Sequence, residues 1–213
     1  MSIQQLVDKA LLAEQNKERE HSGKFSPSQL GRCYRAQIFK RKGEEQTNPP
    51  DSRALRVFRV GHLFHEFIQD FIPAEQVEVE IEDDDFRGRA DIVEKNCVTD
   101  IKSVHSRSFW YMEKQDYDVC EQKYTNWLQV AWYAWKLGKE YIRILFVSKD
   151  DLCIAEYREK LEDWKDSLMA ELYTLEAWWV SGKLPPAEPR AYGGKECKYC
   201  GYSELCKQIE EDK

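Results

Sequence analysis

Residues 86 to 104 constrain the fold of this chain more than any other stretch, because they predict a β-hairpin with a turn of only two residues. Runs rich in Val, Ile and Thr flank Lys95 and Asn96, and Asn tolerates the positive φ of a tight turn, although the usual Asn-Gly pair is absent. A two-residue loop fixes the pairing of the strands and sets Asp91 directly opposite Asp100. The hairpin therefore forces two carboxylates together.

The two facing carboxylates predict a cation site. Like charges opposite each other on neighbouring strands cost about 0.2–1 kcal/mol, and a bound cation reverses the sign of that interaction. Because side chains alternate along a strand, Asp100 and Lys102 share one side, while Ile101 points away and leaves its carbonyl oxygen near the same edge. Hard oxygen ligands of this kind suit Mg²⁺ or Mn²⁺. The alternative is that Lys102 only pairs with Asp100 on a solvated hairpin, as in most Asp-x-Lys triplets.

Composition bounds the class of protein. The chain has 213 residues, of which 42% are hydrophobic and 33% charged, which predicts a folded globule of one domain, or one with an appendage. No apolar run approaches membrane-spanning length and the N-terminus lacks a signal-peptide profile, so we expect a cytoplasmic protein and no membrane partner. With a net charge of −7, any contact with nucleic acid must come from bound metal and local basic patches, of which two stand out: Arg32, Arg35, Lys40, Arg41 and Lys42, then Arg53, Arg56 and Arg59.

Helices dominate the first third of the predicted structure. A polar, peripheral helix is expected over 2–20, and a second helix is expected to begin at Ser26, which places Cys33 about two turns inside it. A longer helix over 52–71 carries apolar residues at helical spacing that are expected to face a core, namely Val60, Leu63, Phe64, Phe67, Ile68 and Phe71.

Strands and helices then alternate in an order that predicts an α/β fold with one mixed central sheet flanked by helices. Residues 77–82 alternate Val or Ile with Glu, which predicts a half-buried strand, and Asp83 to Asp85 are expected to form its solvated turn. Further strands are expected over 141–147 and 152–157, and helices over 121–137, ended by Gly138, and over about 159–180.

Two helices carry polar residues that match a site. His65 lies four residues after Gly61 and therefore on the same helix face, although a lone His beside an apolar face is more often structural. A mid-helix Gly usually marks close approach to the backbone. Gln129 and Tyr133 are likewise four residues apart, and the alternative for this pair is ordinary helix-surface polarity.

The tail carries a second candidate site. Cys197, Cys200 and Cys206 fall within ten residues, the first two as Cys-x-x-Cys, and Cys33 is the best-placed fourth ligand. With seven cysteines and no export signal, thiolate ligands are favoured over a disulfide framework. Zinc usually takes two local pairs, whereas one distant cysteine with a terminal triplet is more typical of an iron-sulfur cluster that holds both ends of a chain.

Taken together, these motifs resemble the PD-(D/E)XK nuclease superfamily, in particular its RecB-like iron-sulfur branch, which includes the AddB nuclease domain and the CRISPR-associated exonucleases. The resemblance covers residues 30 to 206. It rests on five features in order: Gly61-x-x-x-His65, Gly88-x-x-Asp91, Asp100-Ile101-Lys102, Gln129-x-x-x-Tyr133, and one early with three late cysteines.

The resemblance implies a restriction-endonuclease-like core and a set of residue roles. His65, Asp91, Asp100 and the Ile101 carbonyl would bind Mg²⁺ or Mn²⁺, with Lys102 orienting the attacking water or neutralising phosphate charge. Gln129 and Tyr133 would support the site and contact DNA. Asp at position 100, where many relatives have Glu, departs from the pattern, and no proline precedes Asp91. A [4Fe-4S] cluster is implied at Cys33, Cys197, Cys200 and Cys206, with Zn²⁺ less favoured.

On this basis the chain divides into a peripheral helix (1–24), a helical segment with Cys33 and His65 (25–75), a nuclease core (76–182) and a cysteine-rich tail (183–213). The expected activity is that of a DNA exonuclease acting on single strands or DNA ends, with DNA and other repair or CRISPR adaptation proteins as partners. Two alternatives stay open: a non-catalytic DNA-binding scaffold, and a structure-specific endonuclease.

Overall fold

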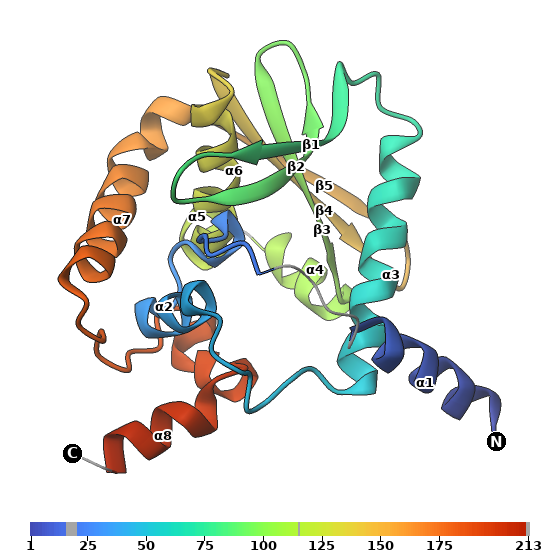
Figure 1. Ribbon diagram of the computed structural model, residues 1–213. Helices are drawn as coiled ribbons and strands as arrows, with labels where there is room; N and C mark the ends of the chain where they lie inside the picture. The colour runs from blue at the N-terminus through green and yellow to red at the C-terminus, as the bar shows by residue number, and fades with distance from the viewer. Residues whose placement is uncertain (16–20, 115, 212–213) are drawn as a thin grey trace.

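A computed structural model describes residues 1–15, 21–114 and 116–211, and its centre is one mixed five-stranded sheet between helices (Figure 1). The strand order is β1-β2-β3-β4-β5. Only β3 and β4 run parallel, and every other neighbouring pair is antiparallel. The strands span the following residues: β1 Gln76–Glu82, β2 Arg87–Val93, β3 Cys97–Val104, β4 Tyr141–Ser148 and β5 Ile154–Lys160. The expected α/β fold with a mixed sheet is thereby confirmed.

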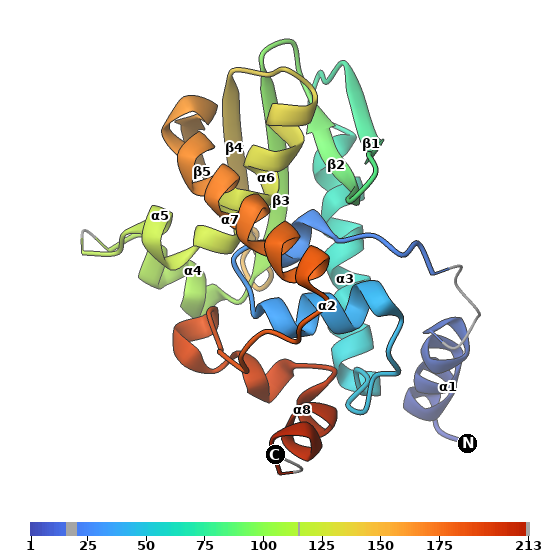
Figure 2. The same cartoon turned by 60° about the vertical axis from the view of Figure 1, so that its left-hand side comes forward.

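The helices lie on both faces of this sheet (Figures 1 and 2). α3 covers one face, and α6 with α7 covers the other. The helices span α1 Ile3–Gln15, α2 Tyr34–Lys42, α3 Ser52–Gln69, α4 Ser106–Met112, α5 Val119–Gln122, α6 Tyr124–Lys136, α7 Leu161–Ser181 and α8 Ser203–Glu211, with 3₁₀ turns at η1 Pro27–Gln29, η2 Tyr192–Gly194 and η3 Glu196–Tyr199. Among the described residues, no helix is both long and apolar enough to cross a membrane.

The predicted hairpin is present with the predicted register. Ile92 pairs with Thr99 and Val93 with Val98, as a two-residue loop at 95–96 requires. The backbone ladder stops there. At the next position the Asp91 carboxylate accepts a hydrogen bond from the Ile101 backbone N–H at 2.7 Å. The two strands therefore separate where the two aspartates lie.

The larger core lies between the sheet and α6. Trp127, Leu128 and Trp132 of α6 are fully buried there, because the apolar residues of this helix recur on every side of it. The helix ends before Gly138, whose φ of 63° is the left-handed conformation expected at a helix end. The predicted helix over 121–137 is confirmed in type, although its first residues form the separate short helix α5.

The prediction that α3 buries a broad apolar face is wrong, because much less of that face is buried than expected. The helix is present, yet Ile68 is its only buried residue, and Phe64 is partly buried beside it. Four of the residues expected in a core are exposed, with relative exposures of 43% for Val60, 51% for Leu63, 50% for Phe67 and 76% for Phe71. The reason is that α3 covers only a narrow apolar strip of the sheet, which consists of Ile92, Ile101, Leu145 and Val147.

The helix expected to begin at Ser26 is also corrected. Ser26 makes no side-chain capping bond, and only the single turn η1 forms. Gly31 then adopts a φ of 76°, where a Cβ would lie 3.0 Å from Leu128 of α6, so the chain docks on α6 instead of continuing as a helix. Cys33 consequently stands immediately before α2 rather than two turns inside a helix.

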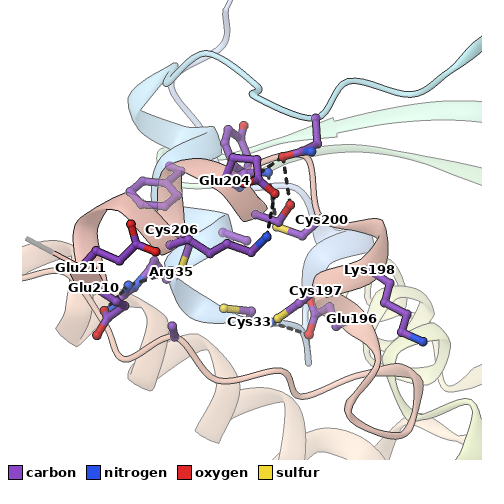
Figure 3. A pocket seen from close by; sticks show the side chains of 17 residues that line it. Cys33, Arg35, Glu196, Cys197, Lys198, Cys200, Glu204, Cys206, Glu210 and Glu211 are labelled. Atoms are coloured by element: carbon purple, nitrogen blue, oxygen red, sulfur yellow. Dashed lines mark hydrogen bonds and ion pairs between the residues drawn. The ribbon is translucent and has the colours of Figure 1, made fainter.

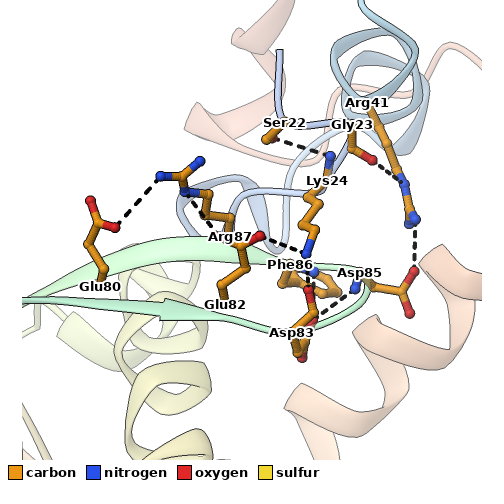
Figure 4. Close-up of polar contacts among 10 residues, drawn as sticks. All are labelled: Ser22, Gly23, Lys24, Arg41, Glu80, Glu82, Asp83, Asp85, Phe86 and Arg87. Carbon is orange, nitrogen blue, oxygen red and sulfur yellow. Dashed lines mark hydrogen bonds and ion pairs between the residues drawn. The ribbon is translucent and has the colours of Figure 1, made fainter. Parts of the chain in front are cut away.

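The acidic turn between β1 and β2 is not simply solvated. Asp85 forms an ion pair with Arg41 at 2.8 Å (Figure 4). Asp83 forms a second ion pair, with Lys136 of α6. Phe25 forms a parallel bridge with Phe86 at the same turn. These contacts fasten the segment before α2 to the β1–β2 turn.

The N-terminal helix is peripheral, as expected, since no residue of α1 is buried. It ends at Gln15, and residues 16–20 of the expected helix lie outside the described residues. An ion pair from Arg56 of α3 to Asp8 joins α1 to the rest of the molecule.

Candidate functional site

The candidate site lies where β2 and β3 separate, with α3 on one side and α6 on the other. Asp91 and Asp100 are the acids of this opening, and their relative exposures are 9% and 1%. Both side chains are thus held in the interior, where a carboxylate is rarely found without a partner.

On the α3 side, Asp91 uses its two oxygens in different ways. One oxygen, Oδ2, accepts the Ile101 N–H, and Oδ1 lies 3.5 Å from Nδ1 of His65. Gln69, one helical turn after His65, donates to the Asp91 backbone carbonyl at 3.0 Å. The structure therefore brings His65 to Asp91. The Ile101 side chain is fully buried against α3, and its carbonyl as a metal ligand remains a prediction.

On the α6 side, Asp100 has two partners. Its Oδ2 lies 2.7 Å from the ammonium of Lys102, and its Oδ1 accepts a hydrogen bond from Gln129 Nε2 at 3.0 Å. Gln129 is itself buried, so surface polarity does not explain it. Lys102 pairs with Asp100 as the solvated-hairpin alternative requires, but the pair stands in the interior beside a second acid.

Tyr133 lies one turn from Gln129 on α6 and reaches the start of the motif in β2. Its hydroxyl oxygen accepts a hydrogen bond from the Arg89 backbone N–H at 3.3 Å. A Cβ on Gly88 would meet this hydroxyl at 2.8 Å and the Pro27 ring at 2.9 Å. Position 88 is therefore glycine because Tyr133 and Pro27 occupy the space of a side chain.

The electrostatics separate the two acids. Burial, reinforced by the nearby Asp91 charge, raises the pKa of Asp100 to about 6 despite the opposing Lys102 ammonium. Burial also disfavours the charged form of Asp91, but the His65 hydrogen bond, the Lys102 charge and the Ile101 N–H bring the pKa of Asp91 below its ordinary value. For His65, burial works against protonation, yet its bond to Asp91 raises the imidazole pKa.

The sequence reasoning missed one acid of this region, Glu78. The nitrogen of His65 and carboxylate oxygens of Glu78 and Asp91 all lie within 4.8 Å of one another, and among the described residues this is the only such set of three. Asp100 is outside it. Glu78 alternates with Glu80 and Glu82 and so resembled the exposed side of a strand. The one signal that could have pointed to Glu78 is its position on β1 opposite Asp91 of β2, two strands away from Asp100.

The donors present fit a hard divalent cation. An imidazole nitrogen with two or more carboxylates is a ligand set that suits Mn²⁺ and, through the oxygens, Mg²⁺. A second observation agrees with this. Two buried acids, Asp91 and Asp100, stand opposite each other where β2 and β3 separate, with Lys102 paired to Asp100 and His65 beside Asp91.

The four cysteines named from the sequence meet at a second place. Cys33, Cys197, Cys200 and Cys206 line one cavity of about 710 Å³ between α2, η3 and α8 (Figure 3). Glu196 anchors this region, because its carboxylate accepts hydrogen bonds from the backbone N–H groups of Cys33, Arg190 and Ala191. Cys33 therefore lies at the same cavity as the three tail cysteines, and its role as a ligand remains a prediction.

The sulfur spacing bears on what this cavity can hold. Four thiolates around one zinc ion, at Zn–S distances of about 2.3 Å, lie about 3.8 Å from one another. Among the described residues, no three cysteine sulfurs fall within 4.8 Å of one another. The four sulfurs therefore stand further apart here than the thiolates of a closed zinc site. Burial raises the pKa of Cys33 and of Cys200.

Comparison with solved structures gives a likeness over nearly the whole chain. The crystal structure of SSO0001 matches with a TM-score of 0.61 and 20% identity, over 97% of this chain and 96% of that one. An alkaline exonuclease from Laribacter hongkongensis, LHK-Exo, matches with a TM-score of 0.44, 13% identity and coverage of 79% and 93%. The structure of LHK-Exo in complex with dAMP matches with a TM-score of 0.45 and 15% identity, over 76% of this chain and 95% of that one. No protein-family model and no curated protein matches the chain.

The likeness to SSO0001 shows a shared fold and, at this identity, nothing of the activity.

Proposed function

We propose that this chain is a metal-dependent deoxyribonuclease of the PD-(D/E)XK type, an exonuclease that hydrolyses phosphodiester bonds in single-stranded DNA or at DNA ends. The observation that supports it most is the grouping of Asp91, Asp100, Lys102 and Gln129 at the point where β2 and β3 separate. These residues come from three elements and match the order of the nuclease motifs. A solvated hairpin has no need to bury two acids or to supply Gln129 from a helix.

The metal in this proposal is Mg²⁺ or Mn²⁺, held by His65, Asp91, Asp100 and the Ile101 carbonyl. When bound, such an ion lowers the pKa of a water molecule and stabilises negative charge on the phosphate. The protein side chains provide the positioning. His65 orients one oxygen of Asp91, and the Ile101 N–H fixes the other. Gln129 holds Asp100 by Oδ1, which turns Oδ2 toward Lys102.

Lys102 has the central chemical role in the proposal. Its ammonium is partly exposed, with 26% of the side chain accessible, and it lies 2.7 Å from Asp100. From there it orients the attacking water and neutralises the charge that develops on the phosphate in the transition state. Tyr133 is held by Arg89 and supports the site from α6. Because these groups would contact the phosphate backbone and not the nucleobases, we expect little sequence specificity.

We further propose a structural [4Fe-4S] cluster at Cys33, Cys197, Cys200 and Cys206. The convergence of the four residues on one cavity supports it, and one distant cysteine with a terminal triplet is more typical of an iron-sulfur cluster than of a single Zn²⁺ site. Purified protein should be brown and contain iron and sulfide. A colourless protein with zinc and no iron would refute the cluster.

The test of the catalytic proposal compares wild type with Lys102→Ala on end-labelled single-stranded DNA with Mn²⁺. We expect degradation by wild type, its loss in a chelator, and a reduction of at least about 100-fold in the variant, the magnitude typical of removing a group that stabilises a transition state. Equal activity in both proteins would end the catalytic assignment. It would leave a DNA-binding scaffold as the better account. Cleavage of closed circular single strands would indicate an endonuclease.

A further inference from the structure

The pairing of β1 with β2 contains an irregularity at Glu78. Val77 pairs with Ile92 and Val79 with Ala90, so the register is the same on both sides and Glu78 stands opposite Asp91. That pair is nevertheless missing from the ladder, and Glu78 has a φ of 52°. Of the non-glycine residues that the structure describes with positive φ, only Glu78 lies within a strand.

The irregular backbone changes where the side chain goes. A regular strand would turn Glu78 toward the same side as Glu80 and Glu82. Instead, its Oε1 accepts a hydrogen bond from Gln69 of α3 at 2.7 Å. Gln69 also donates to the backbone carbonyl of Asp91, so one amide holds Glu78 and Asp91 side by side. The carboxylate is thereby placed beside His65 and Asp91.

We infer that Glu78 is a further protein ligand of the divalent cation, completing with His65 and Asp91 a set of three donors on the side of the site away from Asp100. This rests on the proposed nuclease function, which supplies the cation. It deepens that function, because none of the motifs that suggested the site includes a residue of β1. The donors are one imidazole nitrogen and two carboxylates, a combination that suits Mn²⁺.

Arg89 provides the reason that Glu78 can stand beside Asp91 without a metal. Its guanidinium Nε lies 2.6 Å from Oε2 of Glu78. The Arg89 side chain is 59% exposed, so it can leave for solvent when another cation enters. In this reading Arg89 competes with the metal, whereas Gln69 keeps the carboxylate in place.

The test is calorimetric titration of Mn²⁺ into full-length, metal-free protein, which reads binding without reference to DNA cleavage. Glu78→Gln should weaken the Mn²⁺ Kd by tenfold or more, because it removes a charged oxygen donor. Glu80→Gln is the matched control. It lies two residues along the same strand with an exposed side chain that faces Arg87, and its Kd should stay within twofold of wild type.

Two further variants separate a ligand from a merely structural residue. Arg89→Ala removes the main partner of Glu78 and should leave the Mn²⁺ Kd unchanged or tighter. If Glu78 only braced Arg89, both substitutions would have the same effect on binding. Glu78→Asn guards against misfolding, because Asn tolerates positive φ better than Gln does, and it should weaken binding as Glu78→Gln does.

The inference is overturned if the Kd of folded Glu78→Gln or Glu78→Asn stays within twofold of wild type, or if Arg89→Ala weakens binding as much as they do. Parallel assays with DNA show which proposal has failed. Wild type that binds Mn²⁺ and degrades DNA, with unchanged affinity in the Glu78 variants, refutes only the role of Glu78. Wild type that neither binds Mn²⁺ nor degrades DNA refutes the nuclease proposal as well.

Discussion

At the scale of single residues, Asp91 and Asp100 differ in how their charge is compensated. Asp91 receives a backbone N–H from Ile101 and faces His65, which together favour its ionised form. Asp100 is more completely buried, and its two side-chain partners do not offset that burial. Without a metal, an ionised Asp100 is therefore unfavourable in the folded state and lowers the free energy of unfolding.

This difference predicts how stability depends on pH in metal-free protein. The pKa of Asp100 is raised from 3.8 to about 6, so the folded state holds this proton more tightly than the unfolded state. Protonated Asp100 therefore contributes its full share of stability below pH 3.8, the ordinary pKa of the carboxyl group. That contribution is lost as the pH rises through the folded-state pKa of about 6. Asp100→Asn removes that loss and should raise the free energy of unfolding at pH 8 by about 1–3 kcal/mol.

Urea denaturation in a chelator, at about pH 4.5 and at pH 8, measures this effect. The advantage of Asp100→Asn should shrink at the lower pH, where wild-type Asp100 is protonated. Asp84→Asn, at an exposed position of the β1–β2 turn, is the control and should show no such pattern. Equal destabilisation by Asp100→Asn at both pH values would contradict the account of a buried, unfavourable charge.

At the scale of elements, the two motif glycines predict opposite outcomes. Gly88 of β2 has no room for a Cβ, which would lie 2.8 Å from the Tyr133 hydroxyl and 2.9 Å from Pro27. Gly88→Ala should therefore cost about 1–3 kcal/mol through overpacking. At Gly61 of α3 the nearest atom is Ser103 Oγ at 3.5 Å, an ordinary contact. Gly61→Ala should fit and stabilise the helix by up to about 1 kcal/mol.

Urea denaturation of both variants checks this pair, and Gly88→Ala in a Tyr133→Phe background tests the cause. Removing the hydroxyl should recover part of the loss. A Gly88→Ala protein as stable as wild type would show that β2 and α6 are not packed as described. The ordinary distance of 3.5 Å at Gly61 also corrects the expectation from sequence that this mid-helix glycine marks an especially close approach to the backbone.

The sequence predicts an element well when one rule decides it. Turn length and side-chain alternation fix the register at Asp91 and Asp100, so the hairpin follows from the order of the residues alone. The exposure of Leu63 and Phe67 does not, because helical spacing shows an apolar face but not how wide a strip the sheet offers it. Glu78 could not be predicted as a site residue for a different reason. Its positive φ turns its side chain away from the side that the alternation along β1 predicts.

At the scale of the whole molecule, contacts around the cysteine cavity join the two ends of the chain. Arg35 of α2 is almost fully buried, and its guanidinium donates to the Pro185 carbonyl at 2.7 Å, to Cys206 Sγ at 3.3 Å and to Glu210 at 2.6 Å. Figure 2 shows α8 beside α2 as a result. Phe39 of α2 also packs against the Tyr202 ring, with centroids 5.6 Å apart, and a bound cluster would add stability to the same region.

Cys33→Ser is predicted to lose iron and to loosen the tail, because it removes the one ligand that lies outside residues 197–206. Iron analysis and limited proteolysis measure the two effects, with new cleavage expected after residue 183. Cys153→Ser is the matched control, since Cys153 is exposed and outside the cavity. A Cys33→Ser protein with full iron content would place the fourth ligand elsewhere.

The most direct test of the account is the single-turnover rate of Mn²⁺-dependent hydrolysis of linear single-stranded DNA by wild type and by Asp100→Asn. The substitution keeps the size of the side chain and an oxygen for the hydrogen bond from Gln129, and it removes the buried charge together with the ion pair to Lys102. The account predicts a variant that is more stable without metal at pH 8 and slower in cleavage by at least about 100-fold. Cleavage within twofold of wild type would contradict the claim that the paired aspartates exist to hold a catalytic cation.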